Sequence, residues 1–204
     1  RCKTERSVNL HVYGFDQSCN FSINRNTWEL WCCSKLLCNI ISSSMAEAGQ
    51  SIAALAAYLG VKAGKVTLDG RDKIPVVKGK TGTRRGLVSI AKHLVRAAEK
   101  NSLLGNTTED QAAVDQWLEY RVSLLDRCQG DKELTGVLKE LNTYLADKVY
   151  IVNHILSLAD ILLYYGLHTH FVGMPYYDKE NYMHVSRWFD NVTHKCIFTF
   201  CDSD

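Results

Sequence analysis

The sequence predicts an α+β protein in which helices dominate, and three observations carry this prediction. A short strand-like run, Ile74-Pro75-Val76-Val77, is followed by a glycine-bearing turn at 79–82. Apolar residues then recur at helical spacing through most of residues 107–190. Within that stretch, a Ser-x-x-Asp pattern stands directly before the most apolar segment of the chain. Short strands that precede a run of helices are typical of the α+β class.

The composition is that of an ordinary soluble globular protein. Of the 204 residues, 46% are hydrophobic and 23% are charged, and the formal net charge is +2. A charge this small does not point to a dedicated nucleic-acid binder. No stretch approaches the roughly 20 apolar residues that a membrane helix needs. Most cysteines precede residue 45, so the middle of the chain is interpreted as a reduced, intracellular domain without a disulfide framework.

Residues 1–44 differ from the rest of the chain. They are rich in Cys, Asn, Ser and Trp and show no clear periodicity. Met45 is followed by small and acidic residues and then by a helical pattern, which is typical of a native start. We therefore interpret residues 1–44 as a non-native or disordered extension, with a genuine flexible extension as the alternative. A signal peptide is disfavoured because a long polar segment and Lys35 precede the short apolar run.

Between residues 45 and 100 the pattern predicts a helix, a strand and a second helix. Ile52, Leu55 and Leu59 fall at helical spacing, and Gly60 can end that helix. The strand at 74–77 and the turn at 79–82 come next. An amphipathic helix follows from residue 87 to about residue 99.

Four helices are predicted after residue 100. The first begins after Thr107, where Asp110 can complete a capping box, and the second carries the apolar residues of 134–145. The third spans Ala159 to Phe171 and is apolar around most of its circumference, so we expect it at the centre of a bundle. The fourth contains Trp188 and Phe189.

Ser157 and Asp160 form the most informative local motif. The Ser157 hydroxyl can accept the amide of Asp160, while the Asp160 carboxylate can accept the amide of Ser157. A buried helix needs such a cap because its first amides have no water to bind. The motif is similar to the capping box of the central helix in the C-terminal domain of glutathione transferases.

The resemblance extends over about residues 45–194. The strand at 74–77 looks like the one that begins at the cis-proline of the transferase thioredoxin-like domain. The runs at 116–122, 158–168 and 185–189 resemble those of small, glutathione-transferase-like auxiliary subunits of the multi-aminoacyl-tRNA synthetase complex. The implied fold is a degenerate thioredoxin-like domain at 45–100 followed by an all-helical domain at 101–194. Residues 195–204 do not continue the family helix and are expected to form an atypical tail.

The resemblance implies a protein that is not an enzyme. Transferases hold the γ-glutamyl end of glutathione with an acid–serine pair where this chain has Gly86-Leu87. Residues 45–74 show no first strand carrying a catalytic hydroxyl or thiol, and Tyr58 lies on a predicted helix, where packing is its expected role. An active glutathione transferase is the alternative.

No cofactor or metal is expected. His168 and His170 are two apart on a helix and point to different sides. Cys32, Cys33 and Cys38 have no second pair at zinc-ligand spacing. A basic cluster surrounds the predicted turn and is interpreted as a solvated hairpin, with weak tRNA or phosphate contact as the alternative; it comprises Lys78, Lys80, Arg84 and Arg85.

The family's partners are methionyl-tRNA synthetase and glutamyl-prolyl-tRNA synthetase, which carry transferase-like domains. The resemblance places one pairing face on the helices at 88–99 and 108–126, and its expected contact residues are Val88, Ala91, Val95 and Arg121. A second contact is expected at Arg187, whose planar guanidinium suits a bidentate interface contact. The implied location is the cytoplasm, with a nuclear role in DNA-damage signalling. The alternative is an elongation-factor-complex subunit without synthetase contact.

Overall fold

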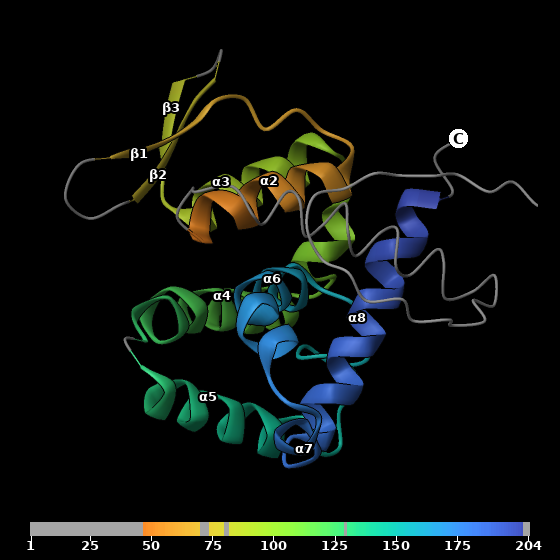
Figure 1. Ribbon diagram of the computed structural model, residues 1–204. Coiled ribbons are helices and arrows are strands. Elements are labelled where there is room, and N and C mark those ends of the chain that lie inside the picture. Colours follow the sequence, from red (N-terminus) through yellow and green to blue (C-terminus); the bar gives the residue numbers. More distant parts are fainter. Residues whose placement is uncertain (1–46, 70–73, 80–81, 129, 202–204) are drawn as a thin grey trace, which may run out of the picture.

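The computed structural model describes residues 47–69, 74–79, 82–128 and 130–201 (Figure 1). The first half contains α2 (Glu47–Leu59), β1 (Val66–Asp69), β2 (Ile74–Gly79), β3 (Gly82–Arg85) and α3 (Leu87–Ala97). The second half contains α4 (Thr108–Ser123), α5 (Asp131–Tyr144), α6 (Leu158–Gly173), α7 (Tyr176–Glu180) and α8 (Met183–Cys201). Two short 3-10 helices lie at Asn101–Leu104 and Leu125–Arg127. The predicted α+β, mostly helical class is therefore confirmed.

The three strands form one antiparallel sheet in the order β1-β2-β3. Gly79 pairs with Gly82, as expected for a hairpin whose two loop residues lie outside the described ranges. β1 was not predicted from the sequence. The comparison of Pro75 with a cis-proline is wrong, because no peptide bond in the described residues is cis. Pro75 instead takes part in the ladder, opposite Leu68.

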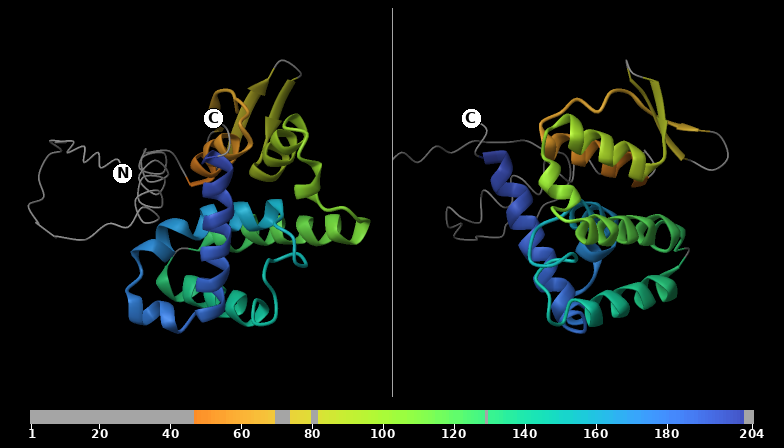
Figure 2. Two further views of the ribbon diagram at one scale, coloured as in Figure 1. Left: turned by 90° about the vertical axis from the view of Figure 1, so that its right-hand side faces the viewer. Right: turned by 180° about the vertical axis from the view of Figure 1, so that it is seen from behind.

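Helices α2 and α3 lie to one side of the sheet and join it to the helical half (Figures 1 and 2). Their apolar faces enter a single core that also includes the apolar faces of α4, α5, α6 and α8. Fully burying one large apolar side chain contributes roughly 1.5–3 kcal/mol, so this shared core is what holds the two halves together. The predicted boundary between residues 100 and 101 stays a prediction.

Helix α6 is the centre of the bundle. All of its residues from Leu158 to Leu167 are buried, and it contacts α2, α4 and α8. A helix that is apolar on all sides is stable only when other elements surround it. The predicted central helix is confirmed.

Helix α8 corrects the expected tail. It continues beyond His194 to Cys201, and Cys196 is buried. Val192 and Cys196 are four residues apart and extend the buried stripe that Val185 and Trp188 begin, which explains why the helix does not stop. The predicted extension at 1–44 lies outside the described residues, as do Cys32, Cys33 and Cys38. Within the described ranges, no helix is long and apolar enough to cross a membrane.

Candidate partner-binding surfaces

Arg121 does not lie on a partner-facing surface. It is 0% exposed, and Nε donates to Asp126 Oδ1 at 2.8 Å while Nη2 donates to Ser51 Oγ at 3.1 Å. Nη1 donates to the backbone carbonyl of Leu162 in the middle of α6. The guanidinium thus joins α4 to α2 and α6 inside the protein. The sequence-based assignment of Arg121 as a contact residue is corrected, because no part of its side chain reaches the surface.

Gly166 makes room for Arg121. A Cβ atom built at Gly166 would overlap the guanidinium group. Only glycine lets the planar group lie flat against the backbone of α6 at this point. The burial of Arg121 therefore depends on a residue that lies 45 positions further along the chain.

Ala91 and Val95 are also buried in the core of the chain itself. They belong to the buried core, so they support the packing of α3 and do not offer contact surface to a partner. Val88 is half-buried at the edge of the same helix. Of the four residues assigned to the first pairing face, only Val88 reaches the surface.

The accessible residues of this region define what we call the α3–α4 face, namely Val88, Lys92, Arg96, Asp115 and Glu119. Lys92 Nζ lies 2.5 Å from Asp115 Oδ1, and this ion pair joins α3 to α4. Arg96 and Glu119 are exposed and form no ion pair within the described residues. The face therefore presents a positive ridge on α3 beside a negative ridge on α4.

Arg187 lies at the surface of α8, and the structure holds its guanidinium in place. Nη2 donates to the carbonyl oxygens of Leu145 at 2.7 Å and Lys148 at 2.9 Å, at the end of α5. Val149 is 42% exposed, and Met183, one turn before Arg187 on α8, is 67% exposed. We call Val149, Met183 and Arg187 the Arg187 surface. A fixed arginine together with exposed apolar side chains on the same two elements has the composition of an interface hot spot.

The capping box at the start of α6 forms as the sequence predicts. The Ser157 hydroxyl accepts the amide of Asp160, and Asp160 Oδ2 accepts the amide of Ser157 at 3.0 Å. Asp160 Oδ1 also accepts the amide of Ile151 and the indole N–H of Trp188, both at 2.8 Å. Burial raises the pKa of Asp160, while these hydrogen bonds act in the opposite direction. Thr107 and Asp110 form the second predicted box, at the start of α4.

The start of α3, which the resemblance compares with part of the transferase glutathione site, carries Gly86 and Leu87. Gly86 begins α3 with no side-chain cap, and the first turn of that helix contains no acidic residue. Tyr58 is buried and packs into the core of the chain, with Lys100 Nζ 5.2 Å from its ring centre. Among the described residues, no group of three or more His, Cys, Asp or Glu side chains could hold a metal ion.

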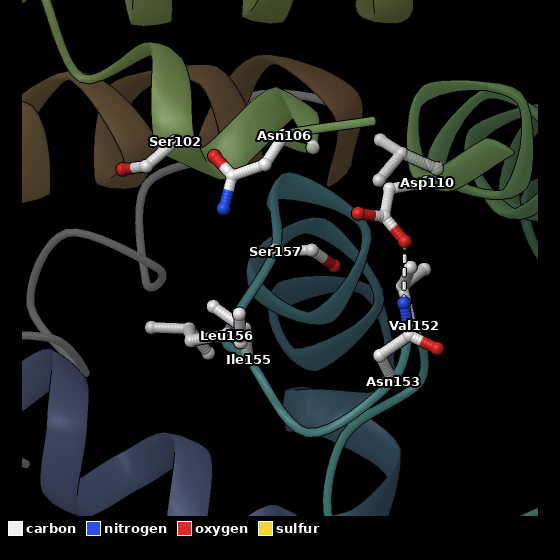
Figure 3. Close-up of a pocket in the computed structure, with 10 residues that line it drawn as sticks. Ser102, Asn106, Asp110, Val152, Asn153, Ile155, Leu156 and Ser157 are labelled. Atoms are coloured by element: carbon white, nitrogen blue, oxygen red, sulfur yellow. Dashed lines mark hydrogen bonds between the residues drawn. The ribbon is translucent and has the colours of Figure 1, made fainter. Parts of the chain in front are cut away.

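One small cavity lies between the starts of α4 and α6 and the loop before α6 (Figure 3). Asp110 and Asn153 meet at its edge in a hydrogen bond, and Ser157 lines its floor. Its volume of about 20 Å³ suits roughly one water molecule. A tripeptide substrate does not fit there.

The fold is that of the glutathione transferases. A transferase from Pichia kudriavzevii superposes with a TM-score of 0.62 at 20% identity, over 77% of this chain and 91% of that one. At such identity the likeness shows the fold alone. A family described as "Nuclear-export cofactor Arc1p" matches residues 110–196.

Sequence relatives place the chain more narrowly. The mouse "Eukaryotic translation elongation factor 1 epsilon-1" is 47% identical over 138 residues, 67% of this chain and 79% of the relative. The human protein of the same name is 44% identical over 149 residues, 72% of this chain and 86% of the relative. The chain belongs to the eukaryotic translation elongation factor 1 epsilon family. A Chinese hamster "Bifunctional glutamate/proline--tRNA ligase" is 31% identical over 102 residues, 50% of this chain and 7% of the ligase.

Proposed function

We propose that this protein is a non-catalytic adaptor of the cytoplasmic multi-aminoacyl-tRNA synthetase complex. The observation that carries the proposal is the family relationship, which extends over 79–86% of the mouse and human relatives. The likeness to part of a glutamate/proline–tRNA ligase supports it, because a related module within a synthetase is a natural pairing partner. The same family resemblance supports a nuclear role in DNA-damage signalling.

The start of α3 supports a non-catalytic role. In a transferase this helix start would hold the γ-glutamyl carboxylate, and here Gly86 and Leu87 offer neither a hydroxyl nor a charge to it. Losing both groups that orient a substrate removes the positioning on which catalysis depends. What the fold retains is surface for pairing.

We assign the two partners to two separate surfaces. The α3–α4 face lies on α3 and α4, whereas the Arg187 surface lies on α8 and the end of α5. Figure 1 shows α8 along one side of the bundle, whereas the sheet and the start of α5 lie on the other side. Separate surfaces allow methionyl-tRNA synthetase and glutamyl-prolyl-tRNA synthetase to bind at the same time. We propose that each surface takes one of the two.

The test is a binding assay with the transferase-like domains of the two synthetases as separate ligands. We expect each domain to bind the full chain, and we expect saturation with one domain to leave the affinity for the other unchanged. Competition between the domains would contradict the two-surface assignment. Binding of neither, with recovery of elongation-factor subunits from an affinity pull-down, would favour the elongation-factor alternative.

A thiol-conjugation assay tests the enzymatic alternative. We expect no transfer of glutathione to an electrophilic acceptor above the rate without protein. A rate that saturates with glutathione concentration would contradict the non-catalytic proposal. Glutathione binding without turnover, measured by calorimetry, would show that the anchoring site persists in altered form.

A further inference from the structure

The sheet region is far more basic than the protein as a whole. Residues 60–86 contain eight Lys or Arg and only two Asp, although the full chain has a net charge of only +2. Residues 87–204 contain 11 Lys or Arg and 16 Asp or Glu. The positive charge is therefore concentrated in the segment that carries the three strands, which Figure 1 shows projecting from the helices.

The fold brings these basic residues together. In the β1–β2 register, Val66 pairs with Val77, and extending that register by one residue places Lys65 opposite Lys78. A Cβ atom at Gly64 would lie 3.5 Å from Val77, so the segment carrying Lys62 runs against the same part of β2. On the other side of β2, Lys78 pairs with Thr83, so Thr83 lies on the same face of the sheet as Lys78.

Three of these cations have no carboxylate partner within the described residues. Lys62, Lys65 and Lys78 are exposed and form no ion pair there, whereas Arg85 is paired with Asp69. Lys65 and Lys78 lie opposite each other, and like charges in such positions on neighbouring strands destabilise a sheet. Arg84 and Arg85 on the edge strand would discourage edge-to-edge aggregation. That role does not extend to Lys78, which lies on the central strand.

We propose that this basic sheet end, defined by Lys62, Lys65 and Lys78, binds the phosphate backbone of RNA. Neighbouring exposed lysines without a carboxylate partner among the described residues match the closely spaced negative charges of a nucleic-acid backbone. The hydroxyl of exposed Thr83, beside Lys78, adds a donor for a phosphate oxygen. The exposed residues of this site include no aromatic side chain, so backbone contact is favoured over base stacking. The site is separate from both proposed docking surfaces.

The experiment measures the binding of fluorescently labelled, unfractionated tRNA to the full chain by anisotropy at several salt concentrations. We compare wild type with Lys65→Gln/Lys78→Gln. The matched control is Lys132→Gln/Lys139→Gln, which removes the same charge from two exposed positions on α5. We expect the sheet variant to bind tRNA about tenfold more weakly at low salt and to lower the salt slope by about one per lysine removed. We expect the α5 control to bind like wild type.

Three outcomes would overturn the proposal. Equal weakening by both double variants would mean that net charge alone attracts the RNA. Absence of tRNA binding to the wild type at low salt would exclude the site. Binding of a labelled polyglutamate peptide, but not of tRNA, would assign the patch to an acidic protein partner.

Three further measurements keep the test specific. Lys62→Gln/Lys65→Gln addresses the same site from the segment before β1 and should weaken tRNA binding to a similar extent, while thermal melts show that each variant is folded. Affinity for the two synthetase domains should be unchanged in all variants. A failure of RNA binding is thus distinguished from a failure of the proposed adaptor function.

Discussion

Trp188, on α8, donates its indole N–H to Asp160 at the start of α6 over 2.8 Å. The same carboxylate oxygen accepts the amide of Ile151, and the other oxygen accepts the amide of Ser157. One buried carboxylate therefore holds together the first turn of the central helix, the loop before it and the last helix. The capping box is one part of a larger network.

Asp160→Ala should destabilise the protein more than Ser157→Ala. Removing the carboxylate leaves three buried N–H groups unpaired, and each such group costs about 1–3 kcal/mol, so we expect a loss of about 3 kcal/mol or more. Ser157→Ala removes one cap and should cost about 1–2 kcal/mol. Urea unfolding of both variants and of the double variant measures the losses. The double variant should lose less than the sum of the two. A loss below about 1 kcal/mol for Asp160→Ala would mean that the network does not form.

Gly166→Ala should be strongly destabilising. The added methyl group would overlap the Arg121 guanidinium and displace it from its partners on α2 and α6. Overpacking and disruption of a buried charge together should cost about 3 kcal/mol. Gly136→Ala is the matched control, because Gly136 lies in α5 with open space around it. That change should stabilise by about 0.5–1 kcal/mol. Similar thermal melts for the two variants would contradict the tight fit at Arg121.

The sequence allows the helical half to be predicted because its signals are local. The spacing of apolar residues, together with the two capping boxes, predicts where α4 and α6 begin. β1 escaped prediction because it has only four residues, and an apolar–polar alternation this short is a weak signal. The continuation of α8 could have been found from the four-residue spacing of Val192 and Cys196.

Arg121 shows what local patterns cannot reveal. The resemblance implied an exposed Arg121, and a charged side chain on a helix is ordinarily exposed. Its burial depends on Ser51 and Asp126 as partners and on the missing side chain of Gly166. These residues lie on separate elements, and only the fold brings them together. The docking surfaces could not be predicted from local patterns either, because the shape of a partner is not encoded in this chain.

The stability of the protein should fall as the pH drops below about 6.5, in part because of His168. Burial lowers the pKa of His168, whose ring packs against those of Tyr164 and Phe189. Because the pKa of His168 is lower in the folded protein than in the unfolded chain, the unfolded chain binds the proton first as the pH falls. Stability is therefore lost as the pH drops through the pKa of the unfolded chain towards the pKa of the folded protein. His168→Phe should remove this contribution. The measurement compares the unfolding free energies of the two proteins at pH 5.5 and pH 7.5. An identical pH dependence in both would exclude His168 as a contributor.

Arg187→Ala should leave the protein folded and weaken the binding of one synthetase domain. Arg187 is exposed on α8, while the neighbouring Trp188 and Phe189 are buried, so the core of that helix does not depend on it. Losing its hydrogen bonds to the carbonyls of Leu145 and Lys148 should cost about 1 kcal/mol of stability. Truncating a central interface arginine typically costs about 2 kcal/mol of binding or more, which is roughly a thirtyfold loss of affinity.

The matched variant for this prediction is Arg96→Ala, which removes the same side chain from the exposed surface of α3. Because the two arginines belong to different surfaces, the two substitutions should weaken the binding of different synthetase domains. Arg187→Ala should weaken the binding of one synthetase domain and spare the other, and Arg96→Ala should do the reverse. Titration of each variant with each domain gives four affinities. Unchanged affinities for Arg187→Ala would remove this residue from the interface. If Arg187→Ala weakened the binding of both domains and also lowered the melting temperature, the hydrogen bonds from Arg187 to the end of α5 would be structural. They would then be required for the fold that both surfaces share.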